Sequence, residues 1–136
     1  MMKQVIAATL LMGLALPAAA QEREPGKPVA VHFVKFKPGS LDRISEIESK
    51  YFDPAAEKVG IRPIIIRMAS GDWDRQYIFP MKSMGDLDYT TTPENKAWLA
   101  EVDKLAGAPG SAQKLLAEWG GAIVRDKHDF GFSDQK

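Results

Sequence analysis

Apolar residues recur along this chain with two periods, every second residue in some stretches and at helical spacing in others. Four short stretches are rich in β-branched and aromatic residues and end at turn-forming residues, which predicts strands. These strands are residues 29–36, 61–68, 75–81 and 122–130. Amphipathic patterns predict helices over residues 40–59 and 93–105, and a shorter helix over residues 111–119. The resulting order of main elements is β-α-β-β-α-β.

Capping residues mark the ends of the predicted helices. Ser40 is a predicted N-cap of the first helix, and Gly60 is its predicted stop. Pro54 interrupts this helix, and Asp53 before it can act as a cap, so we expect a kink or a short second segment there. Thr92 followed by proline predicts the start of the second helix, and Ser111 is a predicted cap of the last one.

The first strand has two apolar faces. Because side chains alternate along a strand, one face carries three apolar residues and the opposite face carries four residues. The first face has Val29, Val31 and Phe33, and the second has Ala30, His32, Val34 and Phe36. Helices can cover only one side of a four-stranded sheet in this arrangement, so the other side needs a second cover. A partner subunit is the simplest cover, which predicts a homodimer.

The order of elements predicts an α+β fold, the ferredoxin-like split βαβ arrangement with a four-stranded antiparallel sheet. In this arrangement the first strand lies between the fourth and the third, and the second and third strands form a hairpin. One domain is predicted over residues 29–131, preceded by a flexible, charged, proline-containing leader at residues 21–28. Residues 132–136 are predicted to be a frayed tail.

The first twenty residues have the pattern of a cleaved secretory signal. Lys3 supplies a positive start, residues 5–16 are apolar, and small residues lead up to Ala20. A helix of this apolar stretch would rise only about 18 Å, which is well short of a hydrocarbon core of about 30 Å. We therefore expect cleavage near Ala20, a mature chain that begins near Gln21, a periplasmic or secreted protein, and no stable membrane association.

Composition excludes several classes of function. Without Lys3 the chain has 17 basic and 18 acidic residues, so nucleic acid is not an expected partner. The absence of cysteine excludes disulfides, Cys-ligated metal centres and thiol chemistry. No phosphate-binding glycine loop and no Gly-x-Ser-x-Gly motif is present. No cofactor is therefore expected from the sequence.

The chain resembles the dimeric α/β-barrel superfamily, and within it the NIPSNAP or EthD-like branch. The motifs that carry the resemblance are residues 34–39, 52–55 with Gly60, 71–75 running into 77–80, and Ser83 with 86–87 before a helix that carries Trp98. The resemblance implies two ferredoxin-like protomers with their sheets face to face. Members of the superfamily include monooxygenases and dehalogenating or haem-handling enzymes. The haem-handling members carry a histidine on a helix, and the predicted helices here contain none.

The chain contains only two histidines, His32 and His128, and they are the first candidates for chemistry. If the first and fourth strands are neighbours, as the resemblance implies, the two side chains come within reach of each other. Such a pair can transfer protons or hold a ligand, because histidine titrates near neutral pH. The alternative is structural, with His32 a satisfied core residue and His128 a partly exposed strand residue.

Further candidates concern ligand binding and metal binding. Arg67 shares a strand face with apolar residues, so it either grips an acidic ligand or forms a salt bridge with Asp72 or Asp74. Four aromatic residues either line a pocket or belong to the core, namely Trp98, Trp119, Tyr51 and Phe79. Two clusters, Asp72-x-Asp74 and Asp86-x-Asp88, are more typical of turns than of metal sites, so no metal is predicted.

Two functions of different classes fit these observations. One is an exported homodimer that binds a small apolar or acidic ligand between helices and sheet, with a cofactor-free, monooxygenase-like reaction as its catalytic form. Of the candidate residues, His32 is then the best acid–base group, and Arg67, Trp98 and His128 are the other predicted ligand-binding residues. The other is a dimeric binding or assembly module without catalysis. A deep pocket that reaches His32 would favour the first function.

Overall fold

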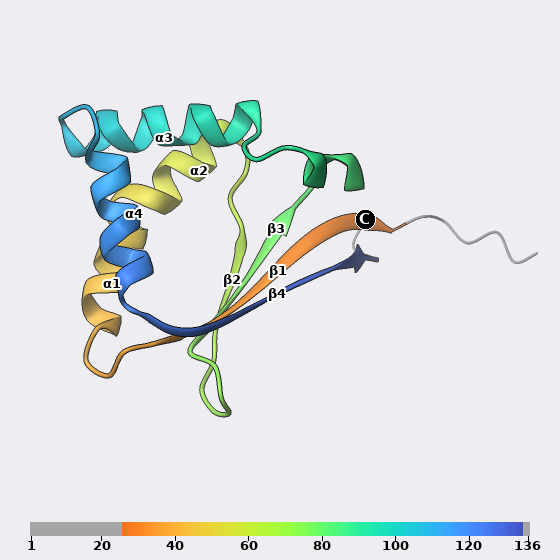
Figure 1. Ribbon diagram of the computed structural model, residues 1–136, viewed down its shortest axis with the longest axis horizontal. Helices are drawn as coiled ribbons and strands as arrows, with labels where there is room; N and C mark the ends of the chain where they lie inside the picture. The colour runs from red at the N-terminus through yellow and green to blue at the C-terminus, as the bar shows by residue number, and fades with distance from the viewer. Residues whose placement is uncertain (1–25, 135–136) are drawn as a thin grey trace, which may run out of the picture.

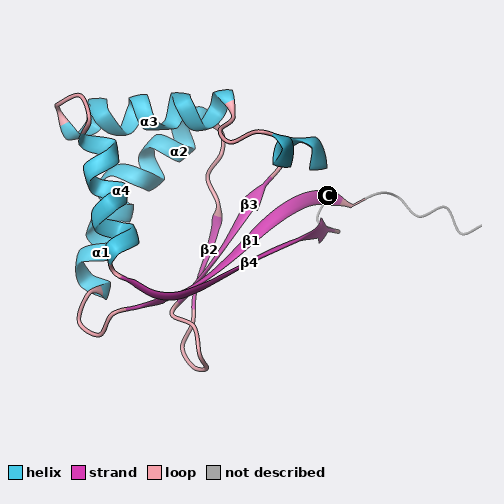
Figure 2. Cartoon of the chain, in the orientation of Figure 1, coloured by secondary structure: helices cyan, strands magenta, loops and turns pink. Residues whose placement is uncertain are grey.

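Strands and helices follow the predicted order in a computed structural model that describes residues 26–134 (Figure 2). The elements are β1 (Lys27–Phe36), α1 (Leu41–Ile47), α2 (Asp53–Val59), β2 (Ile64–Arg67), β3 (Arg75–Pro80), α3 (Pro93–Ala106), α4 (Ser111–Gly121) and β4 (Ile123–Ser133). A π-helical turn, Glu48–Phe52, joins α1 to α2, and a 3₁₀ turn, Met84–Asp88, follows β3. The predicted signal sequence lies outside the described residues.

The four strands form one antiparallel sheet in the order β2-β3-β1-β4. The first strand is central, as predicted, and pairs residue by residue with β3 on one side and β4 on the other. In this register His32 lies between Tyr77 of β3 and His128 of β4. The predicted α+β, ferredoxin-like fold is confirmed.

The helices of the described range lie on one side of the sheet (Figure 1). On that side Val34 and Phe36 are buried, in agreement with the predicted alternation. The opposite face has no helix over it within residues 26–134 and presents apolar side chains to the surroundings. On this open face, Ile64 is 52% and Ile66 is 40% exposed. The apolar residues of the open face are Val29, Val31, Phe33, Ile64, Ile66 and Ile78, and the polar residues Gln76, Lys127 and Asp129 lie on the same face.

The buried side chains form two clusters. The first lies between helices and sheet and is built from Val34, Phe36, Ile44 and Tyr77, with Trp119 and Ile65 packed against it. The second lies among the helices and is built from Ala55, Val102 and Ala112, with Phe52, Trp98 and Leu99 packed against it. The two clusters leave space between them, and the candidate site lies there.

Several helix ends follow the sequence signals. Thr92 caps α3, because its hydroxyl accepts a hydrogen bond of 3.2 Å from the backbone N–H of Asn95. Gly60 ends α2 and Gly107 ends α3, with φ values of 76° and 82°. Glycine adopts this left-handed conformation without the steric cost that a β-carbon imposes.

Two capping predictions are corrected. The Ser40 hydroxyl makes no capping bond and instead donates to the carbonyl of Lys37 at 2.7 Å. Ser111 lies inside α4, whose first backbone N–H groups are held by Asp103 of α3. The Asp103 carboxylate accepts from the N–H of Gly110 at 3.1 Å and of Ala112 at 2.7 Å. A cap supplied from another helix cannot be read from local sequence.

The first and last strands are longer than predicted. The first strand begins at Lys27, inside the predicted leader, and β4 runs to Ser133, inside the predicted frayed tail. Lys27 and Ser133 face each other in the sheet, so each end orders the other. Near Pro54 the helical path changes type but does not end. The π-helical turn leads directly into α2, and Pro54 lies in the first turn of α2.

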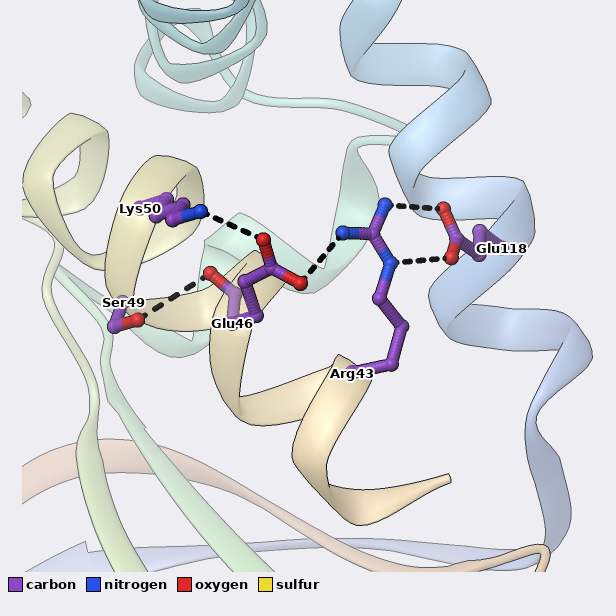
Figure 3. Close-up of polar contacts among 5 residues, drawn as sticks. All are labelled: Arg43, Glu46, Ser49, Lys50 and Glu118. Carbon is purple, nitrogen blue, oxygen red and sulfur yellow. Dashed lines mark hydrogen bonds and ion pairs between the residues drawn. The ribbon is translucent and has the colours of Figure 1, made fainter. Parts of the chain in front are cut away.

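A surface ion-pair network fastens α1 to α4 (Figure 3). Arg43 donates to both oxygens of Glu118, at 2.6 and 3.0 Å, and to Glu46 at 2.9 Å. Lys50 donates to the same Glu46 carboxylate at 2.7 Å. The bidentate bond between Arg43 and Glu118 fixes the geometry of α4 more than it adds stability, because these side chains are exposed.

Within residues 26–134, no helix has the length and apolar character needed to cross a bilayer.

Candidate functional site

A cavity of about 600 Å³ lies between the helices and the helix-facing side of the sheet. This volume is within the usual range for a small-molecule site. Most of its wall is apolar or aromatic, from Ala30, Phe52, Ala56, Ile61, Pro63, Ile65, Phe79, Pro80, Met81, Trp98, Leu99, Leu116 and Trp119. The polar groups at the wall include His32, Glu48, Asp53 and Tyr77, with Lys82, Asp86 and Glu94 on the segment from β3 to α3. The cavity therefore suits a mainly apolar molecule with a polar end.

Two tryptophans position the cavity wall. The Trp98 indole N–H donates to the carbonyl of Phe52 at 3.1 Å, and the two rings meet edge to face with centroids 5.1 Å apart. This contact ties α3 to the π-helical turn. For the four aromatic residues, the sequence left open whether they line a pocket or belong to the core. Trp98, Trp119 and Phe79 line the cavity. Tyr51 packs into the cluster among the helices.

A buried polar network forms the floor of the cavity around Glu48, which is only 5% exposed. The Tyr77 hydroxyl donates a short hydrogen bond to one Glu48 carboxylate oxygen, and the Trp119 indole N–H donates to the same oxygen at 3.2 Å. Arg75, also buried, lies with Nε 3.8 Å from the other carboxylate oxygen and donates to the Ser45 hydroxyl at 3.0 Å. A buried carboxylate is tolerated here because a cation and two donors surround it.

This network also controls neighbouring protonation. Burial, followed by the charge of Glu48, raises the pKa of the Tyr77 hydroxyl, so Tyr77 stays a neutral donor. Burial raises the pKa of Asp53, and the nearby Glu48 charge adds to the effect. Asp53 lines the cavity, so its carboxyl is a candidate for proton exchange with a bound molecule.

His32 and His128 lie together, as predicted from the pairing of the first and fourth strands. Their rings stack with centroids 3.8 Å apart at 18°. The Asp126 carboxylate joins both, with Oδ2 3.0 Å from Nε2 of His32 and 3.3 Å from Nε2 of His128. His32 lines the cavity and its side chain is 12% exposed, while His128, on the same face of the edge strand β4, is 60% exposed. Tyr77 and Trp119 flank His32 at centroid distances of 6.1 Å each.

The electrostatics of this pair favour an uncharged His32. Burial lowers the pKa of His32 and the neighbouring His128 acts in the same direction, while the hydrogen bond to Asp126 opposes them. That hydrogen bond in turn lowers the pKa of Asp126, so Asp126 is an anion at neutral pH. The arrangement is a neutral histidine held by a carboxylate at the cavity wall, which is the geometry of a proton-accepting or ligand-gripping group.

Arg67 lies apart from the histidines, in a second, polar pocket of about 450 Å³. This pocket also presents Arg62, Ser45 and Ser49, and it shares Glu48 and Asp53 with the main cavity. Within residues 26–134 Arg67 forms no ion pair, because Asp74 pairs with Lys35 and Asp72 lies near Arg125. The suggested salt bridge to Asp72 or Asp74 is therefore not formed, and the role in acidic-ligand binding stays a prediction.

The two aspartate clusters have local structural roles. The Asp74 carboxylate accepts from the backbone N–H of Phe36 at 2.9 Å and from Lys35 at 2.9 Å. Asp86 accepts from the backbone N–H of Lys82 at 3.0 Å. These contacts fit the turn-forming role of aspartate that the sequence suggested.

Sequence reasoning missed Glu48, Tyr77 and Asp126 as site residues. A signal existed for Glu48, since it follows Ile44 by four residues and so places a carboxylate within the apolar stripe of the helix. Tyr77 and Arg75 are two residues apart on β3, and this spacing places both side chains on the same face of the sheet. Asp126 lies two residues before His128 on β4 and hence on the same face, which the spacing alone could have shown.

Comparison with known proteins supports the fold. The structure is similar to that of a NIPSNAP family protein from Agrobacterium tumefaciens, with a TM-score of 0.59 and 13% sequence identity, over 84% of this chain and 92% of that chain. At this identity the likeness shows a shared fold, and it confirms at that level the resemblance seen in the sequence.

Two further structures match at lower scores. One is an uncharacterised NIPSNAP domain protein from Burkholderia xenovorans, with a TM-score of 0.48 and 12% identity over 78% of this chain and 93% of that chain. The other, from an uncultured marine organism, is described as a dimeric ferredoxin-like protein, with a TM-score of 0.45 and 9% identity over 83% and 91%. No family model matches the sequence. No curated protein matches it either.

Proposed function

We propose that this chain is an exported, homodimeric binding protein for a small, mainly apolar molecule with a polar end. The observation that carries the proposal is the cavity of about 600 Å³, whose wall is largely apolar and whose floor presents His32, Tyr77 and Glu48. Apolar walls supply binding energy through burial, and a few fixed polar groups orient the ligand. Export rests on the sequence signal described above, which lies outside the described residues.

The catalytic form of this function is a cofactor-free, monooxygenase-like reaction. His32 supports it because a neutral imidazole at a cavity wall, held by an aspartate, can accept a proton from a bound substrate. The non-catalytic alternative, a dimeric binding or assembly module, is supported by the open face of the sheet, whose apolar side chains are partly exposed. Both forms share the homodimer, in which a second copy covers that open face.

Filling the cavity tests the proposal. Ala30 lines the cavity on β1, and its neighbour Val29 points to the opposite face of the sheet. In Ala30→Leu the larger side chain takes up part of the cavity, so the affinity for the apolar fluorescent probe N-phenyl-1-naphthylamine should fall at least tenfold. Fluorescence titration of the purified protein measures this affinity.

The matched control is Val29→Leu, which enlarges a side chain on the open face and should leave the affinity of the probe unchanged. Compounds that displace the probe are then screened by thermal shift against the parent and His32→Gln. A probe affinity that is equal in Ala30→Leu and the parent would place binding outside the cavity and overturn the proposal. If the same compounds bound to the parent and to His32→Gln and gave the same thermal shifts, His32 would not belong to the site.

A further inference from the structure

Three potential metal ligands converge where β1 meets β4. His32 and His128 are directly opposite each other in the sheet, and Asp126 lies two residues before His128 on the same face. One ligand atom from each residue can be chosen so that all three atoms lie within 4.8 Å of one another. The antiparallel register places these side chains together without any contribution from a flexible loop.

The separations match those required around a small divalent ion. A tetrahedral zinc ion bonds nitrogen and oxygen at about 2.0–2.1 Å, which places neighbouring ligand atoms about 3.3 Å apart. The Asp126 oxygen is 3.0 Å from His32 Nε2 and 3.3 Å from His128 Nε2. The carboxylate is therefore already at the correct distance from both imidazoles. The two rings are stacked with centroids 3.8 Å apart, so the exposed His128 ring has to turn away from His32 for both lone pairs to point at one ion.

We propose that His32, Asp126 and His128 form a binding site for a divalent transition-metal ion. Two imidazoles and one carboxylate favour zinc, iron, nickel or copper over calcium and magnesium, which prefer oxygen ligands. Three protein ligands leave at least one coordination position for water or another small ligand. His128 and Asp126 are 60% and 43% exposed, so an ion can enter from solvent without opening the fold.

The surroundings hold the ligands in place. Tyr77 and Trp119 flank the His32 ring, and Glu48 fixes both of these aromatic side chains by hydrogen bonds. Preorganised ligands bind a metal more tightly than mobile ones because less ordering is needed. The metal site needs no organic ligand, but it shares His32 with the cavity, and a His32 nitrogen that binds the ion no longer accepts a proton.

Zinc titration by isothermal calorimetry tests the site directly. The protein is prepared without a polyhistidine tag, stripped with chelator and titrated with Zn²⁺ in the absence of any organic ligand. We expect one ion per chain with a dissociation constant in the micromolar range or tighter. Replacement of zinc by Co²⁺ should give the visible absorption bands of a tetrahedral or five-coordinate site with nitrogen and oxygen ligands.

Three variants locate the ion. His128→Ala and Asp126→Asn change exposed side chains that the fold tolerates, and each should weaken zinc binding at least tenfold and abolish the cobalt bands. Asp129→Asn is the matched control, because Asp129 lies on the same strand with 44% exposure but on the opposite face. Its zinc affinity should equal that of the parent.

Two results would overturn the proposal. One is the absence of stoichiometric zinc binding by the parent at millimolar zinc. The other is binding that is equally tight in the parent, His128→Ala and Asp126→Asn, because the ion would then lie elsewhere. Neither result bears on the binding of the fluorescent probe, so this proposal and the proposed function can fail separately.

Discussion

The two faces of the sheet are built from alternate residues of the same strands, yet they differ in chemistry. The helix-facing side carries His32, Tyr77 and Arg75, all at least partly buried and all engaged in contacts with other polar or aromatic groups. The open face carries valine, isoleucine and phenylalanine, and two of its isoleucines are 40% or more exposed. The buried polar groups thus lie on the side that the helices shield, whereas the side without helices leaves apolar groups partly exposed.

This difference assigns separate tasks to the two faces. A shielded face can hold polar groups in fixed positions around a cavity, because each group has partners that compensate for lost water. An apolar open face gains free energy when another surface removes it from water. The proposed ligand binding thus belongs to the helix-facing side and the proposed assembly to the open face. The first two of the three predictions below test this division.

The largest expected effect is on the helix-facing side at Glu48. Glu48→Ala leaves Arg75 buried without its opposite charge and removes the acceptor of Tyr77 and Trp119, so we expect a loss of about 3–5 kcal/mol in unfolding free energy. Denaturant unfolding measures the loss. Glu46→Ala is the control, since Glu46 lies two residues away in an exposed network and should change the midpoint little. Equal effects of the two changes would contradict the view of Glu48 as the centre of the floor.

A smaller effect is expected on the open face. Ile66→Lys places a charge on this face, so it should raise the dissociation constant of the homodimer about a hundredfold, or about 2.7 kcal/mol. Leu105→Lys, on the exposed side of α3, should leave the dimer intact. Sedimentation velocity across a concentration series distinguishes these cases. A parent protein that stays monomeric at micromolar concentration would refute the assignment of assembly to this face.

The smallest expected effect concerns Asp74, where the sheet meets the connection between β2 and β3. The backbone N–H of Phe36, together with Lys35, holds the pKa of Asp74 below its usual value. A carboxyl with a depressed pKa stabilises the fold above the unfolded pKa of about 3.9, and this stabilisation is lost as the pH falls through the lower folded pKa. Asp74→Asn should therefore cost about 1 kcal/mol at pH 7.

Unfolding measurements across pH check the sign of this effect. The difference in unfolding free energy between the parent and Asp74→Asn should be constant above about pH 5 and should shrink below about pH 4. Asp72→Asn is the control, since Asp72 is exposed nearby, and it should leave the unfolding free energy at pH 7 close to that of the parent. If the difference in unfolding free energy between the parent and Asp74→Asn increased as the pH falls, the assignment of a depressed pKa to Asp74 would be contradicted.

Much of the fold could be predicted because its signals are local. The alternation along residues 29–36, the glycines at 60 and 107 and the Thr92 cap each act within one element, and the structure confirms them. The strand ends were not predictable in the same way. Lys27 and Ser133 become strand residues only because they pair with each other across the sheet, and no local property of either segment reveals that partner.

The candidate site was predicted only where the order of the strands determines it. The meeting of His32 with His128 follows from strand pairing, which the order of elements implies. The position of Arg67 in a different pocket could not be predicted, because it depends on how the π-helical turn sits over β2. The network around Glu48 joins a helix, a strand and α4, so its members become neighbours only in the folded chain.

The π-helical turn Glu48–Phe52 also has a consequence for sequence change in this protein. Such a turn accommodates one residue more than a regular α-helix does, in the way that an insertion would. Deletion of Ser49, which is exposed, would remove this extra residue and restore α-helical spacing, while the segments on either side keep their orientation. Ala55 and Ala56 would then stay in the interior. Loss of one residue should therefore be better tolerated at this turn than in a regular helix such as α3, where it would rotate the downstream residues by about 100°.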